Sequence, residues 1–253
     1  MPRSGRLSGR VALVTGSSRN LGRAVALALA ADGADVAAHG YTDRAGAEAT
    51  AEASLALGVR ASAVSADIGD PAQVHAMVAQ VERELGPVDI LVSCPGYRPK
   101  NNPLAISPEE WRRVLATNLD GPWFCAQAVL GGMAERGWGR VINVAGTGAW
   151  LGEERAPHVA ASKSGLVGLT RALARDYAHA GVLVNLVSPG LLHTEESPYR
   201  IPGRDYKAFA AKMPTGRVTT PEDVAGAIVY LCLPEQRAIT GQTLHVNSGT
   251  YFG

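Results

Sequence analysis

The sequence predicts an α/β fold, a single domain built on a doubly wound parallel sheet of about seven strands. Short runs of Val, Ala, Leu and Ile alternate with long helical patterns along the whole chain of 253 residues. The runs are almost continuously apolar, which is typical of strands that helices cover on both faces. No repeat, low-complexity tract or linker interrupts this rhythm, so we expect residues 1–253 to form one domain.

The expected strands are seven apolar runs, at residues 11–16, 35–40, 59–66, 88–93, 139–146, 182–190 and 242–249. Two helix starts carry capping sequences. Ser107 and Thr220 are each followed by a proline and, three residues on, by an acid, Glu110 or Asp223. The long irregular connection that begins near residue 193 is expected to form a substrate lid over about 193–213.

Composition and charge favour a small-molecule partner. With 24 Lys and Arg against 23 Asp and Glu, the net charge of +1 provides no strong field to hold nucleic acid or an anionic membrane. The three cysteines (94, 125 and 232) are too few for a disulfide framework, and their spacing predicts no metal site. No stretch approaches the ~18 apolar residues of a membrane span, and the first ten residues hold no apolar run. We expect a cytoplasmic protein with no nucleic-acid and no membrane partner.

A candidate phosphate-binding turn follows the first expected strand directly. Its residues are Thr-Gly-Ser-Ser-Arg-Asn-Leu-Gly at 15–22, and a helical pattern follows at once. Such a turn presents backbone N–H groups and the positive end of a helix dipole to a phosphate. The glycines alone would also suit an ordinary tight turn, but their position at the start of the first βαβ unit favours phosphate binding.

This turn resembles the TGxxxGxG turn of the short-chain dehydrogenases/reductases, with Asn20 in place of the middle glycine. Further segments match that family in order and spacing over nearly the whole chain: Asp-Ile at 67–68, NLDG around Asn118, ASKSG around Lys163, PGLLHT at 189–194 and ITGQTLHVNSG at 239–249. The resemblance implies a Rossmann-like fold that binds a nicotinamide dinucleotide.

The resemblance also implies which residues bind the cofactor. The turn residues would hold the pyrophosphate, Asp67 and Ile68 would flank the adenine, Lys163 would reach the nicotinamide ribose, and the segment 189–194 the carboxamide. Where the family has NNAG, this chain has Ser-Cys-Pro-Gly at 93–96, so the backbone contacts are retained while the side chains differ. The expected cofactor-binding residues are Gly16, Ser18, Arg19, Leu21, Gly22, Asp67, Ile68, Gly96, Lys163, Pro189, Gly190, Leu192 and Thr194.

Charge favours NADP(H) over NAD(H) as the cofactor. A fold of this type that prefers NAD ends its second strand with an acid that accepts from the ribose 2′-hydroxyl and repels a 2′-phosphate. That position holds Gly40, and Arg19 and Arg44 are near enough in sequence to reach a 2′-phosphate. The alternative is that either arginine merely faces water. NAD(H) therefore remains open, as the less favoured cofactor.

The catalytic positions depart from the family. Its members pair a serine with Tyr-x-x-x-Lys, in which the tyrosine transfers a proton, the lysine lowers its pKa and the serine orients the carbonyl. Counted back from Lys163, the tyrosine position holds Val159 and the serine position holds Gly146. No tyrosine lies between Tyr97 and Tyr177, so a shift of register cannot restore the motif.

Valine and glycine transfer no proton, so three functions remain open. The chain is an oxidoreductase with a substitute proton donor, which we favour, a non-redox enzyme (cyclisation, isomerisation or dehydration), or a nucleotide-binding subunit without catalysis. His158 is the leading substitute because imidazole titrates near neutral pH, although adjacent helix positions point about 100° apart. Tyr97, His193 and Thr147 are further candidates. The expected catalytic residues are Asn118, Lys163, His158 and Tyr97.

Two further expectations concern the substrate and the assembly. Trp150 and Glu153 follow the fifth strand, in a connection that helps to line the family's substrate pocket. With Gly146 and Val159 beside it, such a pocket would be roomy and partly apolar, suited to a ring-bearing or long-chain substrate. The resemblance also implies a homo-oligomer, most simply a tetramer, formed through residues 107–136, 157–180 and 242–249.

Overall fold

Seven parallel strands form one sheet, in the order β3-β2-β1-β4-β5-β6-β7, in the computed structural model, which describes residues 5–194 and 205–253. The predicted α/β fold with a parallel sheet is confirmed, and each strand lies within its apolar run. The strands are β1 (Val11–Thr15), β2 (Asp35–His39), β3 (Ala61–Val64), β4 (Ile90–Ser93), β5 (Gly139–Val144), β6 (Val182–Pro189) and β7 (Thr243–Val246).

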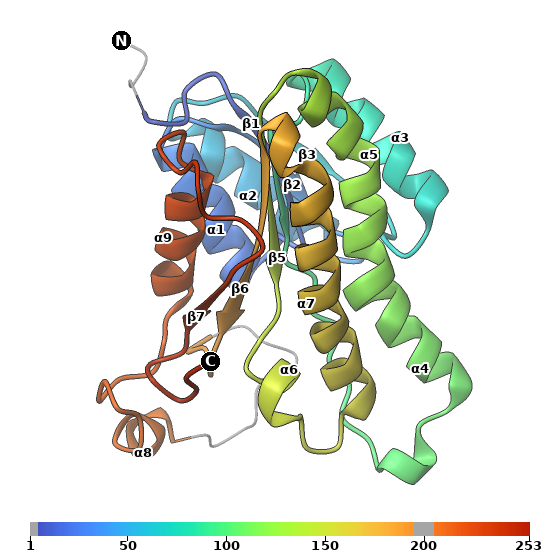
Figure 1. Cartoon of the computed structure of the whole chain (residues 1–253), viewed down its shortest axis with the longest axis vertical. Coiled ribbons are helices and arrows are strands. Elements are labelled where there is room, and N and C mark those ends of the chain that lie inside the picture. The colour runs from blue at the N-terminus through green and yellow to red at the C-terminus, as the bar shows by residue number, and fades with distance from the viewer. Residues whose placement is uncertain (1–4, 195–204) are drawn as a thin grey trace.

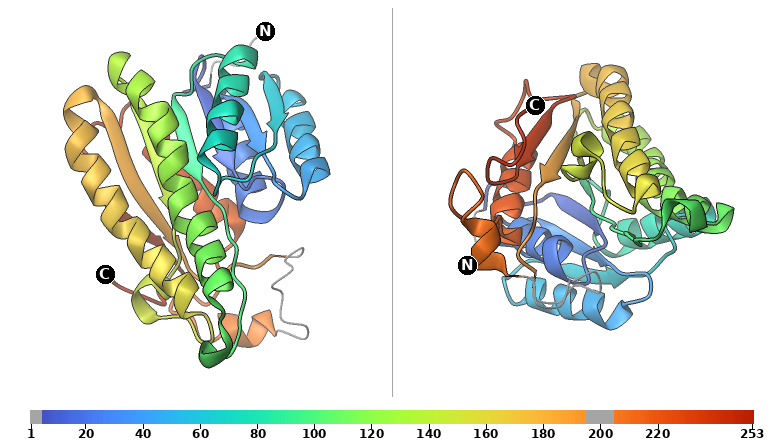
Figure 2. Two further views of the ribbon diagram at one scale, coloured as in Figure 1. Left: turned by 90° about the vertical axis from the view of Figure 1, so that its right-hand side faces the viewer. Right: turned by 90° about the horizontal axis from the view of Figure 1, so that it is seen from below.

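Helices cover both faces of this sheet, as the apolar strands require. One face carries α1 (Asn20–Ala31), α2 (Arg44–Leu55) and α9 (Pro221–Cys232), and the other carries α3 (Pro71–Glu84), α5 (Gly121–Glu135) and α7 (Pro157–Tyr177), as Figures 1 and 2 show. Each layer encloses its own buried apolar cluster against the strands. The continuous apolar runs of β1, β4 and β5 supply side chains to both clusters.

The shorter helices gather mainly at the carboxyl end of the sheet, which is at the bottom of Figure 1. They are α4 (Pro108–Leu115), α6 (Gly148–Leu151) and α8 (Tyr206–Ala210). A π-helical turn over Ala116–Asp120 joins α4 to α5. Single 3₁₀ turns lie at Pro103–Ala105 and Ala178–Ala180. Because parallel strands all end at this edge, the connections that follow them can build a site there.

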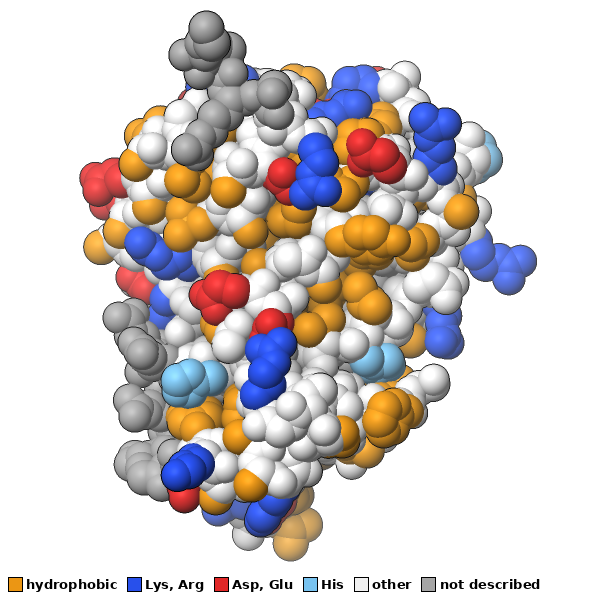
Figure 3. Space-filling view, turned by 90° about the vertical axis from the view of Figure 1, so that its left-hand side faces the viewer, with side chains coloured by type: hydrophobic (Ala, Val, Ile, Leu, Met, Phe, Trp, Pro, Cys, Tyr) orange, Lys and Arg blue, Asp and Glu red, His pale blue; other side chains and the backbone are white. Residues whose placement is uncertain are grey.

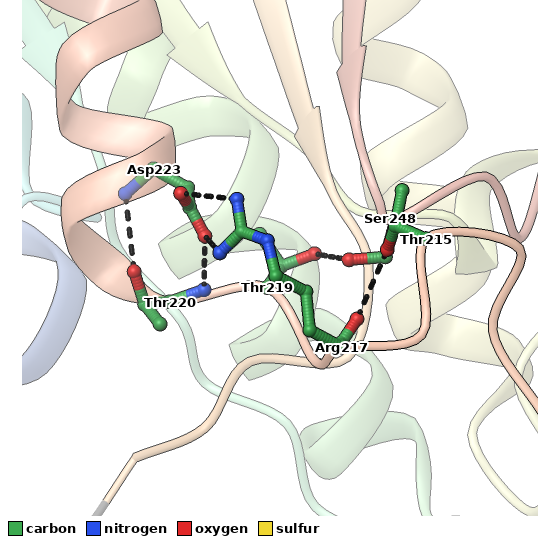
Figure 4. Close-up of polar contacts among 6 residues, drawn as sticks. All are labelled: Thr215, Arg217, Thr219, Thr220, Asp223 and Ser248. Carbon is green, nitrogen blue, oxygen red and sulfur yellow. Dashed lines mark hydrogen bonds and ion pairs between the residues drawn. The ribbon is translucent and has the colours of Figure 1, made fainter. Parts of the chain in front are cut away.

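Both predicted helix starts are confirmed, but their caps differ. Thr220 and Asp223 form a complete capping box: Oγ1 of Thr220 accepts from the Asp223 N–H at 3.2 Å, and Oδ2 of Asp223 accepts from the Thr220 N–H at 2.9 Å (Figure 4). At α4, Oγ of Ser107 accepts from the Glu110 N–H at 3.1 Å. The Glu110 carboxylate does not return to Ser107. It accepts instead from Asn101 and lies against a histidine of α7.

The order in which successive strands are added to the sheet reverses between β1 and β4. β1 pairs with β2 on one side and with β4 on the other, so the connections after β1 and after β4 leave toward opposite faces. In open parallel sheets the crevice at such a switch point is where ligands bind. The predicted phosphate-binding turn lies at this point, directly after β1.

The predicted lid is described only in part, because residues 195–204 lie outside those that the structure describes. The start of the lid is held to the segment just before α9 and to α8. The His193 N–H donates to the Thr219 carbonyl at 3.0 Å, and the His193 ring packs edge-on against Tyr206 of α8 at 4.3 Å between centroids. Hydroxyls of Thr219 and Ser248 lie 2.8 Å apart, which ties this segment to the chain that follows β7 (Figure 4).

The surface carries charges of both signs. On the face that includes α9, Lys and Arg side chains are interspersed with Asp and Glu (Figure 3), in keeping with the formal net charge of +1. Among the helices in the described part of the chain, none has the length and apolar character needed to cross a membrane.

Candidate functional site

The turn after β1 is packed so closely that two of its glycines cannot be replaced without movement. Gly16 has φ +69°, and a Cβ there would lie 2.9 Å from the Cys94 carbonyl oxygen. A Cβ on Gly22 would lie 2.1 Å from the Gly16 carbonyl oxygen. Asn20 has φ +48°, a left-handed conformation that asparagine tolerates better than most residues, which explains its place in a glycine position.

The N-terminus of α1 is open to an anion. Arg19, at the cap position, is extended and makes no side-chain hydrogen bond to the helix, and the first turn contains no acid. The first N–H groups of a helix have no partner within it, and the helix dipole adds positive potential. The residues present therefore fit a phosphate group, as the sequence predicted for Gly16, Ser18, Arg19, Leu21 and Gly22.

A buried histidine at the end of β2, which sequence reasoning missed, holds this turn through hydrogen bonds. Nδ1 of His39 accepts from the Gly16 N–H at 3.1 Å, and Nε2 lies 3.0 Å from the Ala66 carbonyl oxygen. The His39 N–H also donates to Oγ of Ser17 at 2.9 Å. These contacts require a neutral ring with its proton on Nε2, and burial lowers the pKa of His39. In the sequence, His39 is one polar residue within an apolar run, with no signal that it serves the turn.

The end of β2 excludes an acidic side chain. A Cβ on Gly40 would lie 2.4 Å from the Asp43 carbonyl oxygen, so glycine is required there. The nearest acid is Asp43, which caps α2 by accepting from the Gly46 N–H at 3.0 Å and lies 3.8 Å from Nη1 of Arg19. Arg44 pairs instead with Glu48 on the exposed face of α2 at 3.1 Å. Of the two arginines considered, Arg19 is the one beside the end of β2.

Lys163 lies between the ends of β4 and β5. Its Nζ donates to the carbonyl oxygens of Val144 at 2.8 Å and Pro95 at 3.1 Å, and the residue is only 6% exposed. Burial lowers the pKa of Lys163 to about 8. Burial also raises the pKa of the neighbouring Cys94 thiol to about 11, which keeps the thiol protonated at neutral pH. Lys163 is thus the titratable cation of this site.

Asn118 acts as a brace between the turn after β4 and helix α7. Its Oδ1 accepts from the Tyr97 N–H at 3.0 Å, and its Nδ2 donates to the Tyr97 carbonyl at 2.8 Å and to Oγ of Ser162 at 3.3 Å. The residue is fully buried in the π-helical turn. Asn118 therefore fixes the backbone beside Lys163, and its amide is already engaged by the protein.

Neither Gly146 nor Val159 brings a hydroxyl to Lys163. Gly146 faces open space, because a Cβ there would meet only the Pro189 carbonyl oxygen, at 3.8 Å. Val159 is 3% exposed and packs with Val114 and Ala156. Thr147, the residue before α6, is in a helical conformation and makes no side-chain cap to that helix.

The prediction that His158 replaces the missing phenol must be revised. The His158 ring is fully buried against α4, where its Nε2 lies 3.0 Å from Oε1 of Glu110 and its face stacks on Trp111 at 6.4 Å between centroids. This contact lies between α4 and α7 and is separate from the carbonyls that hold Lys163. The rotation between adjacent helix positions sends Val159 and His158 to different surroundings.

Tyr97 and His193, the remaining proton-donor candidates, are exposed, whereas Lys163 is buried. The Tyr97 side chain is 37% exposed, and His193 is exposed beside Tyr206. Trp150 packs against His245 and Tyr251 near the carboxyl terminus, at 4.7 and 5.7 Å between ring centroids. Glu153 pairs with Lys100 at 3.0 Å, which joins the connections that follow β5 and β4.

The expected adenine and carboxamide residues lie at the same edge of the sheet. Asp67 and Ile68 follow β3, and Ile68 is buried against Gly121. Oδ2 of Asp67 accepts from Nη1 of Arg113 at 2.7 Å, an ion pair that the sequence did not reveal. The segment after β6 packs so tightly that a Cβ on Gly190 would lie 2.9 Å from the Asn247 Cα. Pro189 ends β6, and Leu192 forms a single bridge with Thr219 ahead of Thr194.

No group of three or more His, Cys, Asp or Glu residues in the described ranges is arranged to hold a metal ion. The three cysteines are free thiols.

Comparison with known proteins identifies the family. The family model described as enoyl-(acyl carrier protein) reductase matches residues 16–251. The chain belongs to the short-chain dehydrogenase/reductase family of oxidoreductases. A curated relative, 3-oxoacyl-[acyl-carrier-protein] reductase FabG of Vibrio cholerae, is 37% identical over 97% of this chain and 98% of its own length.

Two solved structures share the fold closely. A blue fluorescent protein from a metagenomic library, in complex with NADPH, is 36% identical with a TM-score of 0.88, covering 96% of this chain and 98% of its own. A gluconate 5-dehydrogenase from Burkholderia cenocepacia, in complex with NADP and tartrate, is 30% identical with a TM-score of 0.88, covering 98% and 97%. Both similarities extend over nearly the whole chain.

Protonation of His39 is expected to destabilise the protein. Because the folded state lowers the pKa of His39 below its ordinary value of 6.5, the unfolded chain binds this proton first as the pH falls. The stability that His39 contributes is therefore complete above pH 6.5 and decreases as the pH falls below that value. Urea unfolding from pH 7.5 to pH 5 measures this dependence.

The variant His39→Gln should flatten the pH dependence and lower the free energy of unfolding by about 1–3 kcal/mol, the cost of leaving a buried N–H without a partner. The matched control is His75→Gln, because His75 is exposed on α3. It should retain the wild-type slope. Equal slopes for the wild type and His39→Gln would show that His39 does not control this pH dependence.

Proposed function

We propose that this protein is an NADP(H)-dependent oxidoreductase that interconverts a carbonyl and an alcohol on a small ring-bearing or long-chain substrate. One observation carries the proposal: the N-terminus of α1, which has no side-chain cap, lies at the same sheet edge as the buried Lys163. Gly16 and Gly22 allow the close backbone packing of the turn that precedes it. The complexes of the two similar structures with NADPH and with NADP support the choice of cofactor.

In this proposal the cofactor lies along the carboxyl edge of the sheet. Gly16, Ser18, Arg19, Leu21 and Gly22 hold the pyrophosphate, and Asp67 with Ile68 borders the adenine. Lys163 binds the nicotinamide ribose, and Gly96, Pro189, Gly190, Leu192 and Thr194 enclose the nicotinamide end. When bound, the nicotinamide ring supplies or accepts the hydride. The preference for NADP(H) follows from the glycine that Asp43 enforces at position 40 and from Arg19 beside it.

Proton transfer is assigned to Lys163 in place of the absent phenol. A protonated lysine has three N–H bonds, and Lys163 uses two of them on the carbonyls of Val144 and Pro95. The third N–H is then left for both the nicotinamide ribose and a water beside Gly146, and during reduction it would release its proton through that water to the carbonyl oxygen of the substrate. The neutral amine then regains a proton from solvent. A pKa near 8 suits a group that gives and takes protons close to neutral pH.

The substrate pocket in this proposal is open where most family members carry hydroxyls. Gly146 leaves space for a water or a substrate ring, and Val159 contributes an apolar wall. The lack of a hydroxyl at positions 146 and 159 also favours a second candidate function, a non-redox enzyme that uses the bound nucleotide as a scaffold. Conversion of substrate without any change in nicotinamide absorbance would identify that second function.

A homotetramer is proposed as the working assembly. Large apolar side chains are partly exposed on the helices that would meet in it: Trp111 on α4 and Trp123 on α5 are 39% and 36% exposed. Burying them between copies would remove apolar surface from water. Light scattering at micromolar concentration should give a mass near four times 26.4 kDa, and a monomer mass would exclude the proposal.

The cofactor preference is tested by titration. Calorimetry should show NADPH binding more tightly than NADH, and Arg19→Ala should weaken NADPH binding by about one to two decades and NADH binding by clearly less, because only NADPH also loses a charge-assisted contact to its 2′-phosphate. Arg44→Ala is the matched control, since Arg44 pairs with Glu48, and should have little effect. Equal or tighter binding of NADH by the wild type would contradict the assignment.

The role of Lys163 is tested by the pH profile. Reduction needs the protonated amine, so kcat for reduction should fall as the pH rises through about 8, and the oxidation rate should rise over the same range. Lys163→Met should lower the rate by about two to four decades. His158→Gln is the control and should keep the wild-type profile. A profile without a limb near pH 8, at full cofactor saturation, would remove Lys163 as the proton donor.

A further inference from the structure

A second polar and aromatic cluster lies at the carboxyl edge of the sheet, on the side of β2 and β3. Its members come from four separate segments: Tyr41 after β2, Asp67 after β3, Tyr97 after β4 and Arg113 on α4. Arg113 contacts two of the others: its guanidinium donates to Asp67 and lies over the ring of Tyr41, and the hydrogen bond to Asp67 raises the pKa of Arg113. Sequence reasoning and the family resemblance assigned only Asp67 to the cofactor.

Arg113 is bound by its edge and is partly exposed. Its Nη1 lies 2.7 Å from Oδ2 of Asp67, whose other oxygen accepts from the Gly69 N–H at 3.0 Å. The Asp67 side chain is 16% exposed, whereas that of Arg113 is 42% exposed. The Arg113 Cζ lies 5.6 Å from the centroid of the Tyr41 ring, which is itself half exposed. A carboxylate that holds the edge of a guanidinium leaves its plane available for stacking.

The neighbouring arginine shows how this arrangement differs from an ordinary surface pair. Arg112 reaches Glu109 on its own helix at 3.9 Å, and both side chains are more than three-quarters exposed. Arg113 instead crosses from α4 to the connection after β3. Exposed ion pairs contribute little stability, so stability alone gives no account of why an arginine and a tyrosine face each other at this edge.

We propose that Arg113 and Tyr41 bind the adenine ring of the cofactor, the Arg113 guanidinium stacking on one face of the ring while Asp67 holds the guanidinium in place. This inference rests on the proposed NADP(H) binding and adds residues that select an adenine nucleotide. A guanidinium over an aromatic face is attracted by the π electrons, and the half-exposed Tyr41 ring supplies a second planar surface beside the same slot. Adenine would then lie between α4 and the end of β2.

The test compares two probes, NADPH and adenosine 2′,5′-bisphosphate, by titration calorimetry. Arg113→Met keeps the length of the side chain and removes the charged plane. It should weaken both probes by the same factor, about tenfold, because the whole loss falls on the adenosine half. Arg112→Met is the matched control, one residue away on the same helix, and should bind both probes as the wild type does.

Three further variants separate stacking from charge and from folding. Arg113→Lys keeps the charge without the plane and should also bind more weakly, and Tyr41→Ala should lose affinity that Tyr41→Phe retains. Thermal unfolding of each variant reports any structural damage. Unchanged binding in Arg113→Met, full affinity in Arg113→Lys, or a loss for NADPH alone would each overturn the inference. Failure of the wild type to bind NADPH would instead reject the proposed function.

Discussion

The site depends on the close approach of backbone at the switch point, where the first turn of α1 meets the ends of β1 and β4. Gly16 and Gly22 allow contacts that any side chain would block. The carbonyl of Cys94, the residue after the neighbouring strand β4, lies against Gly16. His39 and Ser17 hold the same turn through buried hydrogen bonds. The result is a helix end whose N–H groups have no side-chain cap, an arrangement that favours a bound anion.

This constraint spreads to the rest of the sheet edge. Lys163 donates to carbonyls that follow β4 and end β5, so α7 is fixed to the strands on the far side of the switch point. Asn118 ties the same β4 connection to α7 from the π-helical turn. The short helix α4 joins the two halves, because Arg113 contacts Asp67 after β3 and Glu110 contacts His158 on α7. The adenosine end and the Lys163 end are thus linked through one short helix.

Much of this could be predicted from the sequence, because local patterns carry it. The apolar runs predicted all seven strands, Gly16 and Gly22 predicted the turn, and Gly40 predicted a strand end without an acid, which steric contact with Asp43 explains. The spacing from Lys163 also predicted that Val159 and Gly146 bring no hydroxyl.

The rest depends on contacts between distant segments, which no local pattern encodes. His39 acts through its partners Gly16 and Ala66, and Arg113 through Asp67, 46 residues away. His158 was misjudged because its neighbour in sequence, Val159, marks the catalytic position, whereas its own direction along the helix brings it to Glu110. The capping box expected at α4 failed for the same reason, since Glu110 is engaged by α7.

The most direct test of the account is a crystal structure of the protein with NADP⁺. We expect the pyrophosphate against the backbone N–H groups at the start of α1, Nζ of Lys163 within hydrogen-bond distance of the nicotinamide ribose, and no protein hydroxyl beside the reacting face of the nicotinamide. A dinucleotide bound away from α1, or a tyrosine hydroxyl brought to that face, would contradict it.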